Sequence, residues 1–213
     1  MKPTALLATV LGAVIVALGV APPPARAAAL TVRSGIEIEV HQTLVTSSEC
    51  TLGAVVSRVT ALTAGHCGNV GQQVYNGAGR RVGTIVANRI NRGLDIAVIR
   101  LAPATQVMLD AIDWSPSLRR GQPVTKFGVN SGFGRGVIID PTPRMRGARG
   151  ISLAPPFLIL RDTVSVRSSL LARSGDSGSG VRDSSGRVIG IVSAGTETET
   201  LVAPVSLLHG HLR

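Results

Sequence analysis

The sequence predicts an all-β fold. Short apolar runs recur at regular spacing and are separated by turn-forming residues, a pattern typical of β-sandwiches and β-barrels. The 213-residue chain also holds 25 glycines and 12 prolines, which implies many turns. Beyond the first 27 residues, no long stretch repeats its apolar residues with the 3.6-residue period of a helix. These observations together argue against a helix-rich fold.

The expected strands form two groups separated by a turn-rich linker, residues 102–121. The first group comprises residues 36–40, 42–45, 51–59, 73–75, 81–87 and 96–101. The second group comprises residues 124–127, 136–140, 157–160, 180–181, 188–193 and 200–204. A short helix is expected over the last residues, 205–212.

Residues 1–27 have the features of a secretory signal. Lys2 gives a positive start, residues 5–20 are apolar, and Ala25-Arg26-Ala27 fits a cleavage site, so we expect cleavage before Ala28. The alternative is an uncleaved membrane anchor, because the apolar run is near the lower length limit of a membrane span. The sequence thus predicts a secreted, periplasmic or cell-envelope protein with no stable membrane span once the signal is removed.

The chain is basic, with a formal net charge of +10 that is carried almost wholly by arginine. Loss of Lys2 and Arg26 with the signal would reduce this charge by two, from +10 to +8. The arginines are scattered and aromatic residues make up only 2% of the chain, so stacking platforms for bases are lacking. Nucleic-acid binding is therefore not expected.

Residues 175–180, Gly-Asp-Ser-Gly-Ser-Gly, are the stretch that carries most chemical information. Such a run favours a tight turn that exposes one side chain and leaves backbone N–H groups free. A nucleophilic Ser177 needs that arrangement, because N–H donors must face the oxyanion that forms on attack. Taken alone, the run is equally typical of a flexible loop.

Two further stretches make a catalytic interpretation stronger. Thr63-Ala64-Gly65-His66-Cys67 places one of only four histidines in a turn of small residues, and Asp95 precedes an apolar strand. The chain order is thus His66, Asp95, Ser177, whereas α/β-hydrolases place the serine first. Each residue taken singly has an ordinary structural explanation, but the three together in this order favour a Ser-His-Asp triad.

With these motifs the sequence resembles the chymotrypsin-like (trypsin-fold) serine endopeptidases, and most of all the bacterial streptogrisin and α-lytic-protease branch. The resemblance spans residues 35–208 and implies two six-stranded antiparallel Greek-key β-barrels with the active site between them. Residues 28–115, with His66 and Asp95, would form the first barrel, and residues 116–213, with Ser177, the second. The resemblance further implies peptide or protein substrates, no cofactor or metal, and a monomer. Weaker support comes from Cys50-Thr51-Leu52-Gly53, Ser131-Gly132-Phe133-Gly134, Ser193-Ala194-Gly195 and Ala203-Pro204-Val205.

The family mechanism, carried over to matching positions, gives each residue a role. Ser177 would attack the scissile carbonyl, His66 would take and return the proton, and Asp95 would hold the imidazole. The backbone N–H groups of Gly175 and Ser177 would form the oxyanion hole.

The two cysteines, Cys50 and Cys67, allow one disulfide or two buried thiols. Export favours the bridge, and closing the loop between them would be worth about 3 kcal/mol in the chain-entropy model. By resemblance to the family, the bridge would anchor the turn that carries His66.

Asp176 needs a cationic partner if it is buried. The resembling bacterial enzymes use an internal arginine, and the matching position here is Lys126, with Arg135 as the alternative. Those enzymes are usually made with a pro-region, whereas cleavage before Ala28 leaves little room for one, so the maturation route is an open question.

Substrate preference is encoded by few residues. Leu171 stands where trypsins carry the aspartate that receives basic side chains, so small or medium apolar side chains are expected before the scissile bond, although Leu171 can be offset by a residue or two. Ser193, Ala194 and Gly195 match the segment that pairs with the substrate backbone, and Gly195 would keep the pocket wall open.

Two alternatives to an active peptidase come from other functional classes. The first is a catalytically silent relative that binds peptides or envelope components. The second is a basic protein that binds the envelope or nucleic acid, for which binding would depend steeply on salt.

Overall fold

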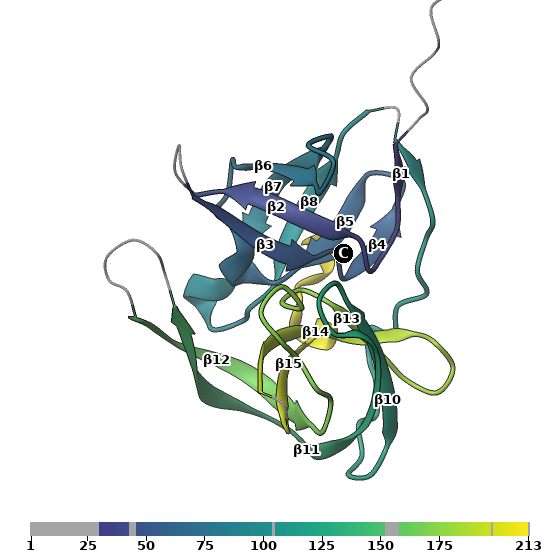
Figure 1. The fold of residues 1–213 in the computed structure, drawn as a ribbon. Helices are drawn as coiled ribbons and strands as arrows, with labels where there is room; N and C mark the ends of the chain where they lie inside the picture. Colours follow the sequence, from purple (N-terminus) through teal and green to yellow (C-terminus); the bar gives the residue numbers. More distant parts are fainter. Residues whose placement is uncertain (1–29, 43–45, 104, 152–157, 197, 213) are drawn as a thin grey trace, which may run out of the picture.

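The computed structural model describes residues 30–42, 46–103, 105–151, 158–196 and 198–212. The expected signal, residues 1–27, lies outside these ranges, as does most of the expected strand 42–45. Two β-structures stacked on each other make up the described molecule, the first half of the chain above the second in the view of Figure 1.

The first half is a curled seven-stranded sheet, in the order β3-β2-β6-β7-β8-β5-β4. All six pairings in it are antiparallel. Its strands are β2 (Glu37–His41), β3 (Ser47–Thr51), β4 (Ala54–Ser57), β5 (Thr60–Thr63), β6 (Gln73–Asn76), β7 (Arg81–Asn88) and β8 (Ala97–Leu101).

The second half is a closed six-stranded barrel, in the order β10-β11-β12-β15-β14-β13. Strand β10 closes it by pairing with both β11 and β13. Its strands are β10 (Pro123–Gly128), β11 (Gly132–Ile151), β12 (Leu158–Ser168), β13 (Gly180–Arg182), β14 (Val188–Gly195) and β15 (Thr200–Pro204). In Figure 1, β11 and β12 extend beyond the barrel as a long two-stranded arm.

Short elements complete the described fold. Strand β1 (Thr31–Val32) pairs in parallel with β9 (Gln106–Val107), which lies in the expected linker. The helical elements among the described residues are single 3₁₀ turns: η1 (Gly65–Cys67), η2 (Ile90–Arg92), η3 (Val205–Leu207) and η4 (Gly210–Leu212).

The predicted all-β, two-barrel class is confirmed, with differences of detail. Leu52 and Gly53 divide the expected strand 51–59 into the end of β3 and β4, and β5 (Thr60–Thr63) lies outside all expected strands, so the first half holds seven strands. Strand β11 is far longer than the expected 136–140, and β12 likewise continues beyond 160. The expected C-terminal helix is two separate 3₁₀ turns, η3 and η4.

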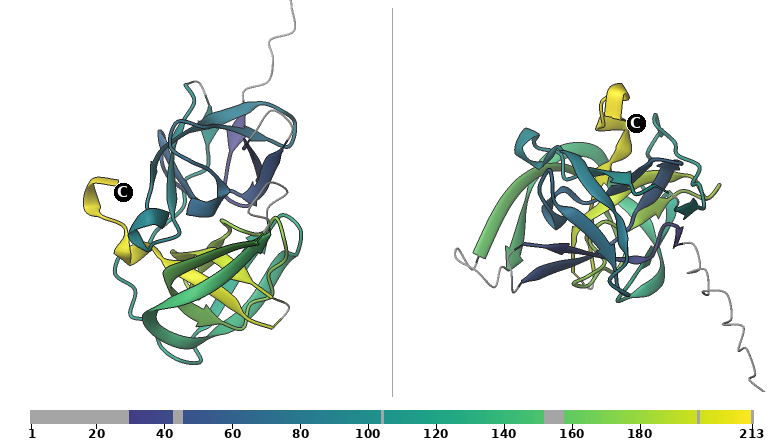
Figure 2. Two further views of the ribbon diagram at one scale, coloured as in Figure 1. Left: turned by 90° about the vertical axis from the view of Figure 1, so that its left-hand side faces the viewer. Right: turned by 90° about the horizontal axis from the view of Figure 1, so that it is seen from above.

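Aliphatic side chains fill two cores, as the low aromatic content requires. In strand β2 the side chains alternate between the core and the surface: Ile38 and Val40 are fully buried, whereas Glu37 and Glu39 are only half-buried. The second barrel has its own cluster, to which nine of the described residues belong. Val205 and Leu208, which follow the last strand, instead belong to the cluster of the first half. The end of the chain therefore returns to the first half and links the two (Figure 2).

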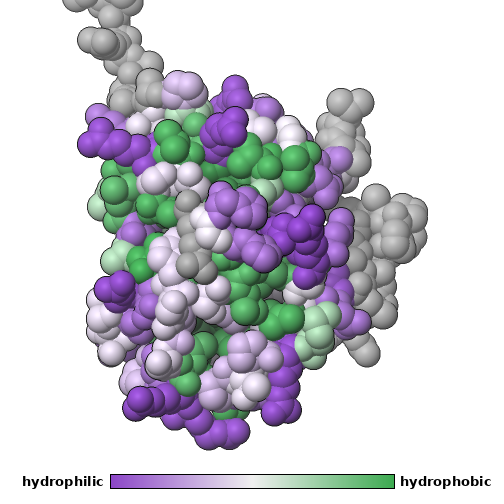
Figure 3. Space-filling model, turned by 180° about the vertical axis from the view of Figure 1, so that it is seen from behind, coloured by the Kyte–Doolittle hydropathy of each residue, from purple (hydrophilic) through white to green (hydrophobic). Residues whose placement is uncertain are grey.

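The outer surface is mixed in polarity. Seen from behind, its hydrophobic side chains appear in several groups between hydrophilic ones (Figure 3). Among the described residues, no helix has the length and apolar character needed to cross a membrane.

Candidate active site

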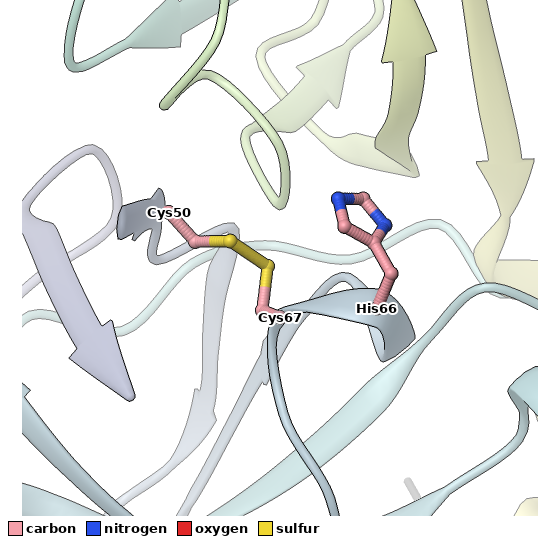
Figure 4. Close-up of side chains that lie close together, drawn as sticks. All are labelled: Cys50, His66 and Cys67. Atoms are coloured by element: carbon pink, nitrogen blue, oxygen red, sulfur yellow. A yellow bond between two sulfur atoms is a disulfide. The ribbon is translucent and has the colours of Figure 1, made fainter. Parts of the chain in front are cut away.

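The first component of the site is the turn that carries His66. Turn η1 comes just after β5. The side-chain amide of Asn88 stabilises it by donating hydrogen bonds of 2.6 Å to the carbonyls of Gly65 and Gly68. A disulfide joins Cys67, at the end of this turn, to Cys50 on β3. Figure 4 shows the disulfide on one side of the turn and the His66 ring on the other. The predicted Cys50–Cys67 bridge is thus confirmed, and it fixes the turn to the neighbouring strand.

Asp95, just before β8, contacts His66 twice. Its Oδ2 lies 2.7 Å from His66 Nδ1, and its Oδ1 accepts a 2.8 Å hydrogen bond from the His66 backbone N–H. Ser193 Oγ, from β14 of the second half, donates a 2.5 Å hydrogen bond to the same Oδ2. The carboxylate is only 3% exposed, so its lone pairs are used within the protein.

These contacts keep Asp95 ionised. Burial by itself would raise the pKa of the Asp95 carboxyl, but the charge of His66 and the hydrogen bonds from His66 and Ser193 outweigh it and lower the pKa below its ordinary value. An ionised Asp95 accepts from Nδ1–H of His66, which leaves Nε2 of the ring free to accept a proton.

Ser177 lies on the turn between Arg173 and β13, at the boundary of the two halves. The turn is built by backbone bonds from Asp176 N–H to Arg173 O (3.0 Å) and from Ser179 N–H to Asp176 O (3.0 Å). Thr51 on β3 ties the turn to the first half, since its N–H donates to Ser177 O at 2.7 Å and its Oγ1 to Gly175 O at 2.8 Å.

Glycines allow the backbones of the two halves to approach closely. Gly178 has φ +90°, and a Cβ there would lie 2.2 Å from Thr63 Oγ1 and 2.4 Å from Thr51 O. A Cβ at Gly53 would lie 2.2 Å from Gly178 O, and one at Gly180 would lie 2.2 Å from Gly53 O. Main chain therefore packs directly on main chain, and a side chain at any of the three positions would force the halves apart.

The two N–H groups proposed for an oxyanion hole are available. Within the described part of the chain, neither the Gly175 N–H nor the Ser177 N–H donates a hydrogen bond. Gly175 has φ +87°, a conformation that favours glycine, and a Cβ there would lie 2.3 Å from the side-chain amide nitrogen of Asn130. The sequence thus permits a backbone orientation that other residues would not.

Asp176 and Lys126 form an ion pair beneath the turn. Lys126 Nζ lies 3.1 Å from Asp176 Oδ2, and both side chains are fully buried. Three backbone N–H groups complete the solvation of the carboxylate: Asn130 and Ser131 donate to Oδ1 (3.0 Å each) and Arg173 to Oδ2 (2.9 Å).

A second N–H of the Lys126 ammonium donates a 2.5 Å hydrogen bond to Ser131 Oγ. Burial would raise the pKa of Asp176, but the hydrogen bonds from Ser131, Arg173 and Lys126 together lower it. Arg135, the alternative partner from the sequence, instead places its guanidinium 5.3 Å from the centre of the Phe133 ring.

The residues expected to bind substrate lie beside this turn. Ala172 rather than Leu171 faces Gly195, because a Cβ added to Gly195 would lie 2.6 Å from Ala172 Cβ. Ala172 is buried and Leu171 is half-buried. Ala172 N–H also bonds to Thr196 O at 3.2 Å, next to the Ser193–Gly195 segment of β14.

The structure thus brings most, but not all, of the expected residues into direct contact. His66, Asp95 and Ser193 are hydrogen-bonded together, as are Lys126 and Asp176. No hydrogen bond joins His66 to Ser177 in the described part of the chain, although Gly178 abuts Ala64, two residues before His66. In unliganded sites such bonds are often long and shorten only with substrate.

Sequence reasoning missed three residues that hold the site. The Asn88 side chain donates a hydrogen bond to the turn that holds His66, and the Thr51 hydroxyl donates one to Gly175 O in the Ser177 turn. The Asn130 N–H donates to the Asp176 carboxylate, and its side-chain amide donates to Ser174 O at 2.8 Å. Each acts on residues that are distant in the sequence, so no local pattern around them could have drawn attention to them.

One cluster of potential metal ligands lies at this site. Among the described residues, one group of three potential ligands comes together, namely Cys50, His66 and Cys67. Both sulfurs are consumed by the disulfide, so they offer no thiolate to a metal ion.

The disulfide gives a first testable prediction. Replacing both cysteines by serine (Cys50→Ser/Cys67→Ser) should lower the free energy of unfolding in urea by about 3 kcal/mol, because the unfolded chain regains the freedom of the closed loop. Dithiothreitol should lower the stability of the parent by a similar amount and leave the double variant unchanged. Equal stability of the parent and the double variant would contradict the prediction.

Comparison with known proteins gives an independent result. The family model described as Trypsin matches residues 32–207, most of the chain. A search of curated proteins finds no match.

Solved bacterial proteases share the fold. Protease A of Thermobifida fusca superposes with a TM-score of 0.62 at 21% identity, covering 84% of this chain and 94% of that one. A Nocardiopsis protease gives 0.61 at 22% identity (85% and 96%), and Cellulomonas bogoriensis chymotrypsin gives 0.59 at 21% (83% and 92%). The expected resemblance is therefore confirmed, and the chain belongs to the trypsin family as a chymotrypsin-like serine peptidase.

Proposed function

We propose that this protein is an exported endopeptidase that hydrolyses peptide bonds through an acyl-enzyme formed on Ser177. The observation that carries the proposal is the geometry of Asp95, which binds both the ring and the backbone N–H of His66. A loop histidine with no chemical role would not need a buried, ionised carboxylate aimed at its Nδ1.

The reaction follows from these contacts. Asp95 fixes the tautomer of His66, whose Nε2 accepts the proton of Ser177 as Oγ attacks the substrate carbonyl. The N–H groups of Gly175 and Ser177 stabilise the oxyanion, and the protonated imidazole then donates its proton to the leaving amine. Water repeats the sequence and releases the acid product. No metal or cofactor takes part in this scheme.

Export and substrate preference are parts of the same proposal. A disulfide persists in oxidising compartments outside the cytoplasm, in agreement with the secretory signal expected in residues 1–27. Ala172 packs closely against Gly195, and neither residue carries a charge. Small or medium apolar side chains should therefore precede the scissile bond, with Leu171 at the margin of the pocket.

The experiment that tests the proposal is labelling with a fluorophosphonate, read by intact mass on the purified chain beginning at Ala28. We expect one adduct on the parent and none on Ser177→Ala, because only an activated serine reacts rapidly with such a reagent. Ser179→Ala is the matched control, since Ser179 is fully buried with its hydroxyl bonded to Asp176 O at 2.6 Å. It should label like the parent.

The absence of an adduct on a folded, disulfide-bonded parent would contradict the proposal. It would favour the remaining candidate, a protease fold that binds peptides without cleaving them.

A further inference from the structure

A groove runs over strands β5, β7 and β8 of the first half and is bordered by the end of the chain. Its volume is about 810 Å³, which lies within the range of about 300–1,000 Å³ that is usual for small-molecule sites. His211 and Leu212 of η4 line one side, and this end of the chain projects from the molecule in both views of Figure 2. None of the lining residues belongs to the candidate active site, so the groove is a separate feature.

The apolar part of the groove is aliphatic. It is lined by side chains that include Val59, Val86, Leu101, Pro103 and Leu212. Val59 is 62% exposed and Val86 37% exposed, so apolar surface in the groove faces water. Among the described residues no Phe, Tyr or Trp lines it. Such a surface suits a hydrocarbon chain better than a ring system that would stack on an aromatic face.

The main chain in the groove is already paired. Strand β8 lies between β5 and β7 and forms antiparallel ladders with both. Beyond the ladders, the N–H of Leu101 donates to Val59 O at 2.9 Å and that of Ala102 to Val82 O at 2.8 Å. A peptide that binds as an added strand needs a free strand edge, and β8 offers none. A ligand in this groove is therefore held by side chains.

The charged part of the groove is positive. Arg58 and Arg100 line it and are exposed, and neither forms an ion pair with a described residue. Thr60, which also lines the groove, stands directly opposite Arg100 on β5, so its hydroxyl lies on the same face as the guanidinium. No aspartate or glutamate is among the described lining residues. A guanidinium binds a carboxylate through two parallel hydrogen bonds, so the groove complements an anionic headgroup of that kind.

We propose that this groove binds one molecule of a free aliphatic carboxylate with a medium or long chain. The hydrocarbon chain would lie along Val59, Val86 and Leu101, and the carboxylate would pair with Arg58 and Arg100. The aliphatic lining selects the chain, and the unpaired guanidinium groups select the headgroup. The inference does not depend on the proposed function, so Ser177→Ala should bind the carboxylate as the parent does.

The test is a calorimetric titration of the chain beginning at Ala28 with decanoate, kept below the concentration at which decanoate aggregates. We expect saturation at one molecule per chain. Affinity should fall by up to about fourfold for each methylene removed in nonanoate and octanoate, the factor for a fully buried methylene. Butyrate should give no measurable binding.

Variants separate the two parts of the site. Arg58→Gln and Arg100→Gln should each weaken decanoate binding by roughly tenfold, because each removes one charged donor from the headgroup. Neutral decanol should bind the parent and both variants equally. Arg120→Gln is the matched control, since Arg120 is an exposed arginine in the turn before β10 and lies outside the groove. It should bind decanoate as the parent does.

Several outcomes would overturn the proposal. Unchanged affinity in Arg58→Gln and Arg100→Gln, an equal loss in Arg120→Gln, or many molecules bound per chain would show only the attraction of a basic protein for any anion. Vesicles containing phosphatidylglycerol and an acidic, leucine-rich peptide are the comparison ligands. Binding of either one without binding of decanoate would assign the groove to a membrane surface or to a peptide instead. Hydrolysis of a nitrophenyl ester by the parent is measured separately, so failure of the carboxylate site leaves the peptidase intact.

Discussion

Replacing Asp95 by asparagine should lower kcat by about 10⁴-fold while leaving the protein folded. This substitution is the standard example of the effect in chymotrypsin-like enzymes. The physical reason lies in the contact at Oδ2, which accepts from His66 Nδ1. An amide NH₂ in that place would donate instead, so Nδ1 would have to accept and Nε2 would carry the proton. The imidazole could then no longer take the proton of Ser177.

The measurement is kcat on a nitrophenyl ester, with circular dichroism to show that the fold persists. Because the residues of a triad act as a unit, adding Asp95→Asn to Ser177→Ala should cost little beyond the serine change alone. Additive losses would contradict the coupling of Asp95 to Ser177 through His66. A loss of tenfold or less for Asp95→Asn would show that the carboxylate serves the fold rather than the reaction.

Lys126→Met should cost about 3–5 kcal/mol of stability, because it leaves the buried Asp176 carboxylate without its cation. Methionine fills nearly the same space, so the change removes charge rather than volume. The damage should reach function too, since Asp176 lies between Gly175 and Ser177, whose N–H groups are proposed to bind the oxyanion. Urea unfolding would measure the first effect and the rate of fluorophosphonate labelling the second.

The pH dependence of the stability of Lys126→Met is the control for this prediction. The pKa of Asp176 is lowered in the folded parent, so its carboxylate stabilises the protein above the unfolded-state pKa and loses this contribution as pH falls through the folded-state pKa. Removing Lys126 raises the folded-state pKa, so the stability lost in Lys126→Met should be largest near neutral pH and should shrink as the pH falls and Asp176 is protonated. In Lys126→Met/Asp176→Asn, part of the lost stability should return at neutral pH, because no buried charge remains. A loss of stability in Lys126→Met that is the same at every pH would contradict the role of the pair.

The sequence revealed the class of fold and the order of the motifs because both are local signals. Strands such as β7 and β8 contain enough alternating or continuous apolar residues to be recognised singly. Strand β5 escaped recognition because only two residues separate it from β4 and neither is glycine or proline. The length of β11 could not be foreseen either, since residues 142–145 are exposed, Pro141 and Pro143 lie within the strand, and the strand continues by pairing with β12.

The site shows the same difference between local motifs, which the sequence reveals, and long-range contacts, which it does not. Its motifs were visible because turns that expose a side chain require glycine and small residues in sequence. The hydrogen bond from Ser193 to Asp95 spans 98 residues and that from Thr51 to Gly175 spans 124. Such contacts depend on how the barrels close and how the two halves pack together, and no local sequence pattern predicts either of these. The spacing from Ser177 predicts Leu171 at the substrate pocket, whereas in the structure the neighbouring Ala172 contacts Gly195.

The contact of Gly53, Gly178 and Gly180 has a consequence for how this protein tolerates change over generations. Because glycine lets the backbones of the two halves approach closely there, the distance between the His66 turn and the Ser177 turn is set mainly by main-chain packing. Substitutions in either core should therefore change stability with little effect on that distance. We expect sequence divergence within the two cores to be tolerated better than a side chain at any of these three glycines.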